Sequence, residues 1–418
     1  MALRYSRNQL VTVLLVALAF SSACGQGGRE RSEVELDEGA AALFVHPDSF
    51  DFASNPELLQ RIRATPHGYF RFINIPFSRL VCERFDHLID TGPLGPDRFP
   101  FNLHGDAHVE QYAVTDLGRG LTDFDDSSEG PGWVDGMRFT VSVRLAALAN
   151  GWEDRADDIV AEFGRGYWDV VEDSTLSAPV PAMVARYQAT FKHDSLAYLA
   201  WVDSIMQPLQ EADRQELLSS LESYSRLMLA TNPGLTDDFF EPIQVGALQL
   251  GVGSALDTKY LVRLAGPTPD PADDVIVELK RVRSLAGIAC IRADDDDPFR
   301  VLQSGVRIAY QPFRFLGFIE HGGEMFWTHA WVANYRELKV ESLESPEELA
   351  EVAYDVGVQL GLGHLRDVGG AFQQMIVVNV RERLREIDGE LQDGSRVLAG
   401  EVIEAWEAFV LASDEPGS

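Results

Sequence analysis

The hydrophobic pattern changes twice along the chain, and these changes constrain the fold more than any other feature. Residues 45–240 mostly show the spacing of three to four residues that is typical of amphipathic helices. Residues 241–340 show strand-like alternation between turn clusters, and residues 341–418 return to helical spacing. Helices on either side of a β-rich segment predict an α+β chain with two lobes, in which the last helices pack on the first half.

The β-rich segment carries the turn signals expected between strands. The stretches IQVGALQL and KYLVRL lie on either side of the glycine-rich GVGS, and VIVELK follows as a further strand. Two more strands are predicted around a hairpin turn at residues 321–323. Beyond them, Ser345, Pro346 and Glu348 predict the start of a helix, because they form a capping box with proline at the first helical position.

The N-terminus predicts export from the cytoplasm. Arg4 and Arg7 precede an apolar run at residues 10–20, which is too short to span a bilayer comfortably and has the features of a signal peptide. The ending SSAC resembles a bacterial lipobox, which implies cleavage before Cys24 and lipid attachment to its thiol. Ordinary secretory cleavage near Ala23 is the alternative.

These features assign residues 1–24 to a lipoprotein signal peptide and the polar, glycine-rich residues 25–44 to a flexible tether. The predicted location is the cell envelope, where the lipid on Cys24 holds the chain on the periplasmic or surface face of a membrane. In an oxidising compartment Cys82 and Cys290 could pair or stay as buried thiols, and the sequence leaves both open.

The charge of the chain limits its partners. The sequence has 66 acidic residues against 35 lysines and arginines, a formal net charge of −31. Because such a surface repels a phosphate backbone, no nucleic-acid partner is expected. The aromatic residues in the helical stretch, among them Tyr198 and Trp201, are interpreted as core rather than as a ligand site.

The segment HGDAHVEQYAVTDLGRGLTDFDD concentrates residues that carry chemistry. Two short apolar runs are expected to end as strands that present Asp106 and Asp123 to one cleft. Phosphoryl transfer uses such a pair, because one carboxylate takes the proton of the attacking hydroxyl and another holds magnesium. His104 and His108 with Asp106, Asp123 and Asp126 could instead ligate zinc or two metal ions.

A second group of residues lies in the β-rich segment. Glycines in GVGS allow backbone amides to approach phosphate oxygens, and Lys280 at the end of VIVELK could pair with the same phosphates. A glycine turn alone is usually only a tight turn, and a lone strand lysine is usually solvated. Their occurrence together in one β-rich segment favours a nucleotide lobe.

In the order of its motifs, the chain resembles a protein-kinase-like fold with its halves permuted, the catalytic half first. More specifically, it resembles the bacterial family called domain of unknown function 2252 (DUF2252). The resemblance rests on TPHGYFRFINIPF, HGDAHVEQYA, LTDFDDSSEGPGWVDGMRF, LGVGSALDTKYLVRL, VIVELK and LGLGHLRDVGG, which span most of residues 60–370. It implies a two-lobed, circularly permuted kinase-like fold that uses ATP and Mg²⁺.

Residue by residue, the resemblance makes Asp106 the catalytic-loop aspartate, with His104 bracing the loop and His108 packed nearby. It makes Asp123 the metal-binding aspartate and Asp125 a second metal contact.

Two further positions match residues that support the site, namely Asp135, which would brace the catalytic loop from a helix start, and Arg71, an arginine of the N-terminal motif with no assigned role. The phosphates would be covered and paired by Gly251, Gly253, Ser254 and Lys280.

The chain departs from this pattern at three places. Gln111 stands where the family and kinases have a metal-binding asparagine, and its extra methylene moves a ligand by about 1 Å, an error that can cost on the order of a hundredfold in rate. Leu256 replaces a glycine of the phosphate loop. The helix predicted after VIVELK offers Arg300 and Arg307 but no glutamate to pair with Lys280.

Three functional hypotheses follow. The first is a kinase-like phosphotransferase or nucleotide-binding protein of the envelope, acting on an unknown small-molecule or protein acceptor. The second is a catalytically degenerate kinase-fold lipoprotein that serves as a binding or scaffold protein. The third is a metal-dependent hydrolase built on the HxDxH and DFDD segments. The sequence does not decide whether the protein is an enzyme.

Overall fold

The computed structural model describes residues 36–89, 100–235, 239, 241–248, 258–294, 296–368 and 370–414. The predicted α+β class is confirmed, since the chain contains helices and three separate sheets in this part. The glycine-loop residues Gly251, Gly253, Ser254 and Leu256, and the predicted signal peptide with Cys24, lie outside the described residues. Within those ranges no helix combines the length and the apolar character needed to cross a membrane.

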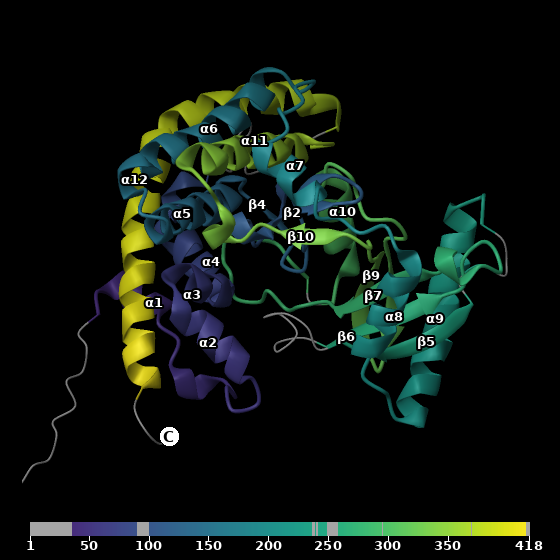
Figure 1. The fold of residues 1–418 in the computed structure, drawn as a ribbon. Helices are drawn as coiled ribbons and strands as arrows, with labels where there is room; N and C mark the ends of the chain where they lie inside the picture. Colours follow the sequence, from purple (N-terminus) through teal and green to yellow (C-terminus); the bar gives the residue numbers. More distant parts are fainter. Residues whose placement is uncertain are drawn as a thin grey trace, which may run out of the picture. The chain divides into compact units, whose positions relative to one another are not determined.

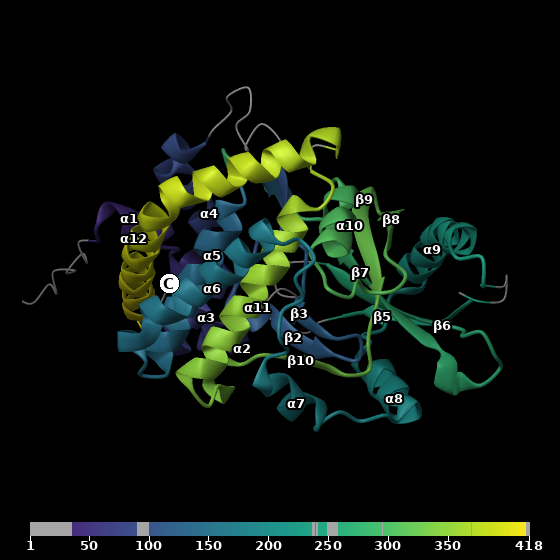
Figure 2. The ribbon, with the colours of Figure 1, turned by 90° about the horizontal axis from the view of Figure 1, so that it is seen from above.

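Most of the helices pack on one another around two hydrophobic clusters. Helix α11 lies along α6, and α12 packs on α5 and α1 (Figure 1, Figure 2), so segments from both ends of the chain share one core. The helices of this layer are α1 (Glu38–Leu43), α2 (Pro56–Ala64), α3 (Pro66–Phe72), α4 (Asn74–Arg84), α5 (Trp133–Ala149), α6 (Ala156–Glu172), α11 (Pro346–Leu365) and α12 (Gln373–Ser413).

Close packing of α6 on α11 depends on small residues at the contact. A Cβ added at Gly166 of α6 would lie 2.2 Å from the carbonyl oxygen of Tyr354, and one added at Gly357 of α11 would lie 2.2 Å from that of Phe163. Glycine at both positions therefore allows the two backbones to approach each other.

A five-stranded antiparallel sheet forms the β-rich segment, in the order β5-β6-β7-β9-β8. Helix α9 packs on β8 and β5, and α10 contacts β9 (Figure 2). The predicted hairpin is confirmed between β8 and β9, where Gly322 and Gly323 both adopt positive φ. The elements are β5 (Pro242–Ala247), β6 (Lys259–Leu264), β7 (Val275–Arg281), β8 (Gly317–His321), β9 (Glu324–Ala330), α8 (Ser195–Ile205), α9 (Glu211–Thr231) and α10 (Pro298–Arg307).

Two small sheets lie beside the helical layer. Strand β1 pairs with β4, and β10, which follows the large sheet in the chain, pairs with β2. The β-rich segment is thus hydrogen-bonded to the first half of the chain through β10. The remaining elements are β1 (Phe101–Leu103), β2 (Tyr112–Thr115), β3 (Arg119–Leu121), β4 (Ser128–Gly130), β10 (Tyr335–Glu337) and α7 (Ala182–Gln188).

The predicted tether at residues 25–44 is wrong at its C-terminal end. Residues 38–43 form α1, which Asp37 caps by accepting a hydrogen bond from the Ala40 backbone N–H. Leu43 is fully buried, and α1 packs on α12. The polar composition that predicts a tether hides these few small and apolar residues, which find their partners only at the far end of the chain.

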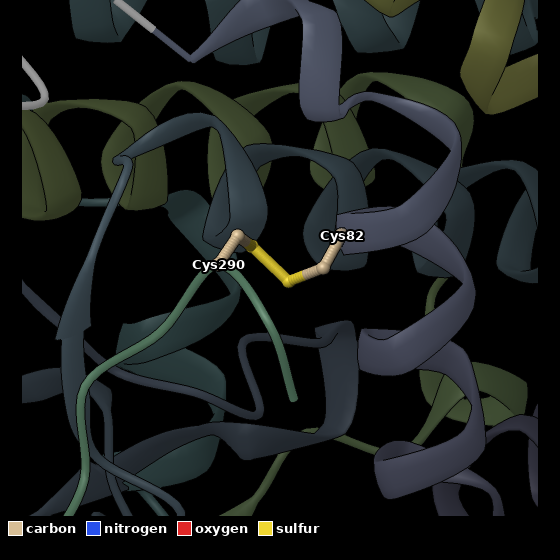
Figure 3. The surroundings of a disulfide bond; sticks show 2 residues. All are labelled: Cys82 and Cys290. Carbon is tan, nitrogen blue, oxygen red and sulfur yellow. A yellow bond between two sulfur atoms is a disulfide. The ribbon is translucent and has the colours of Figure 1, made fainter. Parts of the chain in front are cut away.

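Cys82 and Cys290 form a disulfide, with a Cα–Cα distance of 5.2 Å and a sequence separation of 208 residues. Cys82 comes from α4 and Cys290 from the segment between β7 and α10 (Figure 3). The bond ties the helical layer to a segment that leaves the central strand of the large sheet. Of the two alternatives that the sequence leaves open, the structure has the paired one.

Replacing either cysteine should destabilise the protein. We expect Cys82→Ser and Cys290→Ser each to lower the free energy of unfolding by about 2–5 kcal/mol, because a bond that closes a long loop restricts the unfolded chain. Denaturant titration with and without reductant measures this. The double variant should lose no more than either single variant, and alkylation of both thiols in the unreduced protein would contradict the pairing.

Candidate functional site

The conformation of the loop that carries Asp106 is fixed by contacts with residues that are distant in sequence. Asp135, in the first turn of α5, accepts the backbone N–H groups of His104 (2.6 Å) and Gly105 (2.8 Å) and is also bonded to His364. Gly105 has φ of +82°, and a Cβ there would lie 1.8 Å from the Asp126 carbonyl oxygen. This position therefore requires glycine, and the HGD motif positions the Asp106 carboxylate.

Two side chains, those of Arg138 and His108, hold the Asp106 carboxylate. Arg138, which is 2% exposed, donates from Nε (3.0 Å) and Nη2 (2.8 Å) to Oδ1, and its guanidinium lies over the Phe70 ring at 3.7 Å. His108 Nε2 lies 3.5 Å from Oδ2. Burial works to raise the pKa of Asp106, but the charge of Arg138 and the contact with His108 outweigh it and hold that pKa below its ordinary value.

Lys280, near the end of β7, forms the centre of the site. Its ammonium pairs with Asp123 and, at 2.6 Å, with Asp125. Asp123 has a positive φ of 63°, a conformation that non-glycine residues adopt at a cost. Trp327 of β9 donates from Nε1 to Asp125 Oδ1 at 2.8 Å. Lys280 of β7 and Trp327 of β9 thus join the sheet to the Asp123–Asp125 segment.

The pKa values of the two carboxylates in this cluster are shifted in opposite directions. Burial and the neighbouring charge of Asp123 raise the pKa of Asp125 to about 6. The pKa of Asp123 lies well below its ordinary value, because Lys280 and Lys259 outweigh its burial. The two carboxylates raise the pKa of Lys280 well above its ordinary value despite burial. Asp123 is 36% exposed, so it is the carboxylate that faces the solvent.

Gln111 joins the two halves of the site. Its Nε2 donates to Asp106 Oδ2 (3.3 Å) and to Asp123 Oδ2 (3.4 Å). The longer side chain of glutamine reaches both carboxylates from the short helix at Val109–Gln111. An amide binds a metal ion through its oxygen, but here its nitrogen faces the two carboxylates. Gln111 could therefore ligate a metal ion held by these carboxylates only if its amide turned over.

Two cavities meet at Asp123. One, of about 500 Å³, is lined by Asp106, Gln111 and Asp123 together with basic side chains that include Arg71 and Arg283. The other, of about 810 Å³, is lined by Asp123 and Lys280 and extends over aromatic residues to the segment that follows β9. The site can therefore hold one molecule on each side of the Asp123 carboxylate.

The two histidines of the HGDAH segment point to different partners. His104 Nε2 donates to the Thr122 carbonyl oxygen at 2.9 Å, and its Nδ1 accepts the Asp106 backbone N–H. His108 is buried beside Asp106. Among the described residues, no group of three or more His, Cys, Asp or Glu side chains could hold a metal ion. The HxDxH zinc hypothesis therefore finds no ligand set in this part of the chain.

The remaining predicted residues are placed as follows. Arg71 pairs with Glu110 and lines the smaller cavity. Helix α10 presents Arg300, which is buried and donates to the Asp125 carbonyl oxygen, while the carboxylates that pair with Lys280 come from Asp123 and Asp125.

Several residues of the site carried no signal that sequence reasoning recognised. Arg138 lies in a mainly apolar helix and Glu278 in a mainly apolar strand. A charged residue at a position that is expected to be buried is the one sign in the sequence that could have pointed to them. The interpretation of Trp201 as core is wrong, because its side chain is 48% exposed at the larger cavity, where Tyr198 also lies. Helical spacing identified an apolar face but not what that face covers.

We found no family model, no curated protein and no solved structure that matches the chain. The resemblance to DUF2252 stays a prediction from the sequence, and the function has to be inferred from the geometry of the site.

The raised pKa of Asp125 makes stability depend on pH. Between about pH 4 and pH 6 the folded state binds more protons at Asp125 than the unfolded state does, so its contribution to stability falls as pH rises. We expect the stability of Asp125→Asn relative to the wild type to increase across this window, by up to ~3 kcal/mol. Denaturant titrations at several pH values measure it. The exposed Asp154→Asn variant is the control, and a flat or falling difference for Asp125→Asn would contradict the assignment.

Proposed function

We propose that the protein is a kinase-like phosphotransferase that binds a magnesium nucleotide in the larger cavity and an acceptor in the smaller one. The observation that carries this proposal is the position of Lys280, which pairs with Asp123 and Asp125 where the two cavities meet. A nucleotide in the larger cavity would bring its phosphates to Lys280, and the acceptor hydroxyl would lie beside Asp106.

The order of strands supports the kinase-like resemblance. Lys280 lies on β7, which is third of the five strands both along the chain and across the sheet. In protein kinases the lysine that pairs with the phosphates also lies on the third strand. Asp135, bracing the Asp106 loop from the start of α5, takes the supporting role that the resemblance implies for it.

Asp106 would receive the proton of the acceptor hydroxyl. Arg138 and His108 keep the Asp106 carboxylate ionised, so it can accept a hydrogen bond from the acceptor hydroxyl and orient it. It would take the hydroxyl proton as the oxygen forms its bond to phosphorus. Asp123 and Asp125 offer the carboxylate oxygens that Mg²⁺ prefers, and their pairing with the Lys280 ammonium supports the proposal of a metal ion beside them. A bound magnesium ion would neutralise phosphate charge.

A second candidate is a degenerate kinase fold that binds its ligand without catalysis. The observation that favours it is Gln111, whose amide nitrogen faces both Asp106 and Asp123. An amide donor there competes with a metal ion for the same oxygens. Binding without turnover would support this candidate over the first one.

We also propose an envelope location, with a lipid on Cys24. The disulfide supports an oxidising compartment, because such bonds rarely persist in the cytosol. We expect Cys24→Ala to prevent lipid attachment and to move the protein from the membrane pellet to the soluble fraction after cell fractionation. Wild-type protein that is already soluble and carries no lipid would exclude the anchor.

Removing the Lys280 side chain should abolish nucleotide binding. We expect magnesium nucleotide to raise the melting temperature of the wild type and to leave that of Lys280→Ala unchanged, because the variant lacks the cation that is proposed to pair with the phosphates at the junction of the two cavities. A thermal-shift titration with ATP and GTP, each with Mg²⁺, tests this. Lys339→Ala, which removes a partly exposed lysine paired with Glu337, is the matched control. A wild type stabilised by zinc but by neither nucleotide would refute the proposal.

Asp106→Asn separates binding from transfer. We expect the wild type to release inorganic phosphate slowly by transfer to water, and this variant to keep the nucleotide-induced shift but lose that release. Because Asn still accepts from Arg138 at Oδ1, the loop should stay folded. Equal phosphate release in the variant and the wild type would exclude Asp106 as the base.

A further inference from the structure

The larger cavity has one wall of aromatic rings. Trp331 stacks with Trp201 at a centroid distance of 6.2 Å and an angle of 20°, and Trp327 stacks with His329 at 4.8 Å and 21°. All four residues line the cavity, as does Lys280. Flat rings stack on the π-systems of aromatic side chains, so this wall suits a planar heterocycle.

Glu278 places a carboxylate in the same cavity. It lies two residues before Lys280 on β7, so both side chains point to the same face of the sheet. Its side chain is 9% exposed. Trp331 Nε1 donates to Glu278 Oε2 at 2.7 Å, and His329 Nε2 lies 3.1 Å from the same oxygen. Among the described residues, none donates a hydrogen bond to Oε1.

The carboxylate is ionised and can only accept. The hydrogen bond from His329 and the charge of Lys280 hold the pKa of Glu278 at about 2, against the effect of burial. A buried carboxylate oxygen with spare acceptor capacity favours a ligand that brings N–H donors. It disfavours a ligand that would turn a hydrogen-bond acceptor atom towards the carboxylate.

This chemistry distinguishes the bases. Adenine and cytosine each have an amino donor next to a ring-nitrogen acceptor on their pairing edge, so one lone pair would face the carboxylate. Guanine has two adjacent donors there, the N1–H and the N2 amino group. Guanine is therefore the common base whose pairing edge best matches a lone carboxylate.

We propose that the larger cavity selects a guanine nucleotide, whose N1–H and N2 amino groups donate to Glu278 while its phosphates reach Lys280. This specificity rests on the proposed function, since it assumes that a nucleotide occupies the cavity.

A carboxylate among aromatic rings also suits an organic cation such as a quaternary ammonium. The cavity contains Lys259 as well as Lys280, and these two residues face each other across β6 and β7. The phosphates of a nucleotide could pair with these two neighbouring ammonium groups, whereas an organic cation offers them no partner. The positions of the two lysines therefore favour the nucleotide.

Isothermal titration of the full chain with GTP, ATP and choline, in the presence of Mg²⁺, tests this specificity. We expect GTP to bind at least tenfold more tightly than ATP. Glu278→Gln should weaken GTP binding at least tenfold and change ATP binding less than threefold, because an amide offers both a donor and an acceptor. Glu320→Gln, at an exposed glutamate of β8, is the matched control and should bind like the wild type.

Each outcome has a distinct meaning. Equal affinity for GTP and ATP, both lost in Lys280→Ala, would overturn guanine selection and leave the proposed function standing. Binding of neither nucleotide would overturn both. Choline binding that is lost in Glu278→Gln would assign the cavity to an organic cation. If the Glu278 variant does not fold, the ratio of wild-type affinities for GTP and ATP decides the question.

Discussion

A single buried lysine connects the sheet to the acidic segment from Asp123 to Asp125, and the arrangement of the whole site depends on it. Lys280 is 7% exposed and Asp125 5% exposed, so both charges are largely removed from water. Such a burial costs several kcal/mol per ion unless the charges are paired and hydrogen-bonded. Two carboxylates and the Trp327 indole provide that pairing. The cluster therefore links parts of the chain that are far apart in sequence, and it is where the proposed function places the phosphates and the metal ion.

A different set of contacts holds the loop that carries Asp106. Asp135 satisfies two backbone N–H groups of the loop, and Arg138, whose guanidinium lies over the Phe70 ring, donates to the Asp106 carboxylate. Because α5 supplies both residues, one helix positions the backbone and the side chain of the loop together. Gln111 then joins this loop to the Lys280 cluster through hydrogen bonds of 3.3 and 3.4 Å. These longer contacts are the part of the site that a ligand could most easily rearrange.

Much of the local structure could be predicted because the signals are local. The hairpin at Gly322 and Gly323 and the cap at Ser345 depend on residues a few positions apart, and both are present. The pairing of Cys82 with Cys290 and the docking of α1 on α12 depend on contacts across hundreds of residues, so the sequence left the first open and mispredicted the second. Trp201 shows the same limit, since helical spacing identifies an apolar face without showing that it borders a cavity.

The sequence by itself determined the α+β class, the strands around Lys280 and the residue types available for chemistry, since periodicity and charge are properties of short stretches. Only the tertiary structure decided which of those residues meet. It placed Lys280 between Asp123 and Asp125, turned His104 away from any metal-ligand set among the described residues, and put Glu278 into the aromatic cavity. The reason is physical: the cost of burying a charge depends on the partners that surround it, and those partners come from distant parts of the chain.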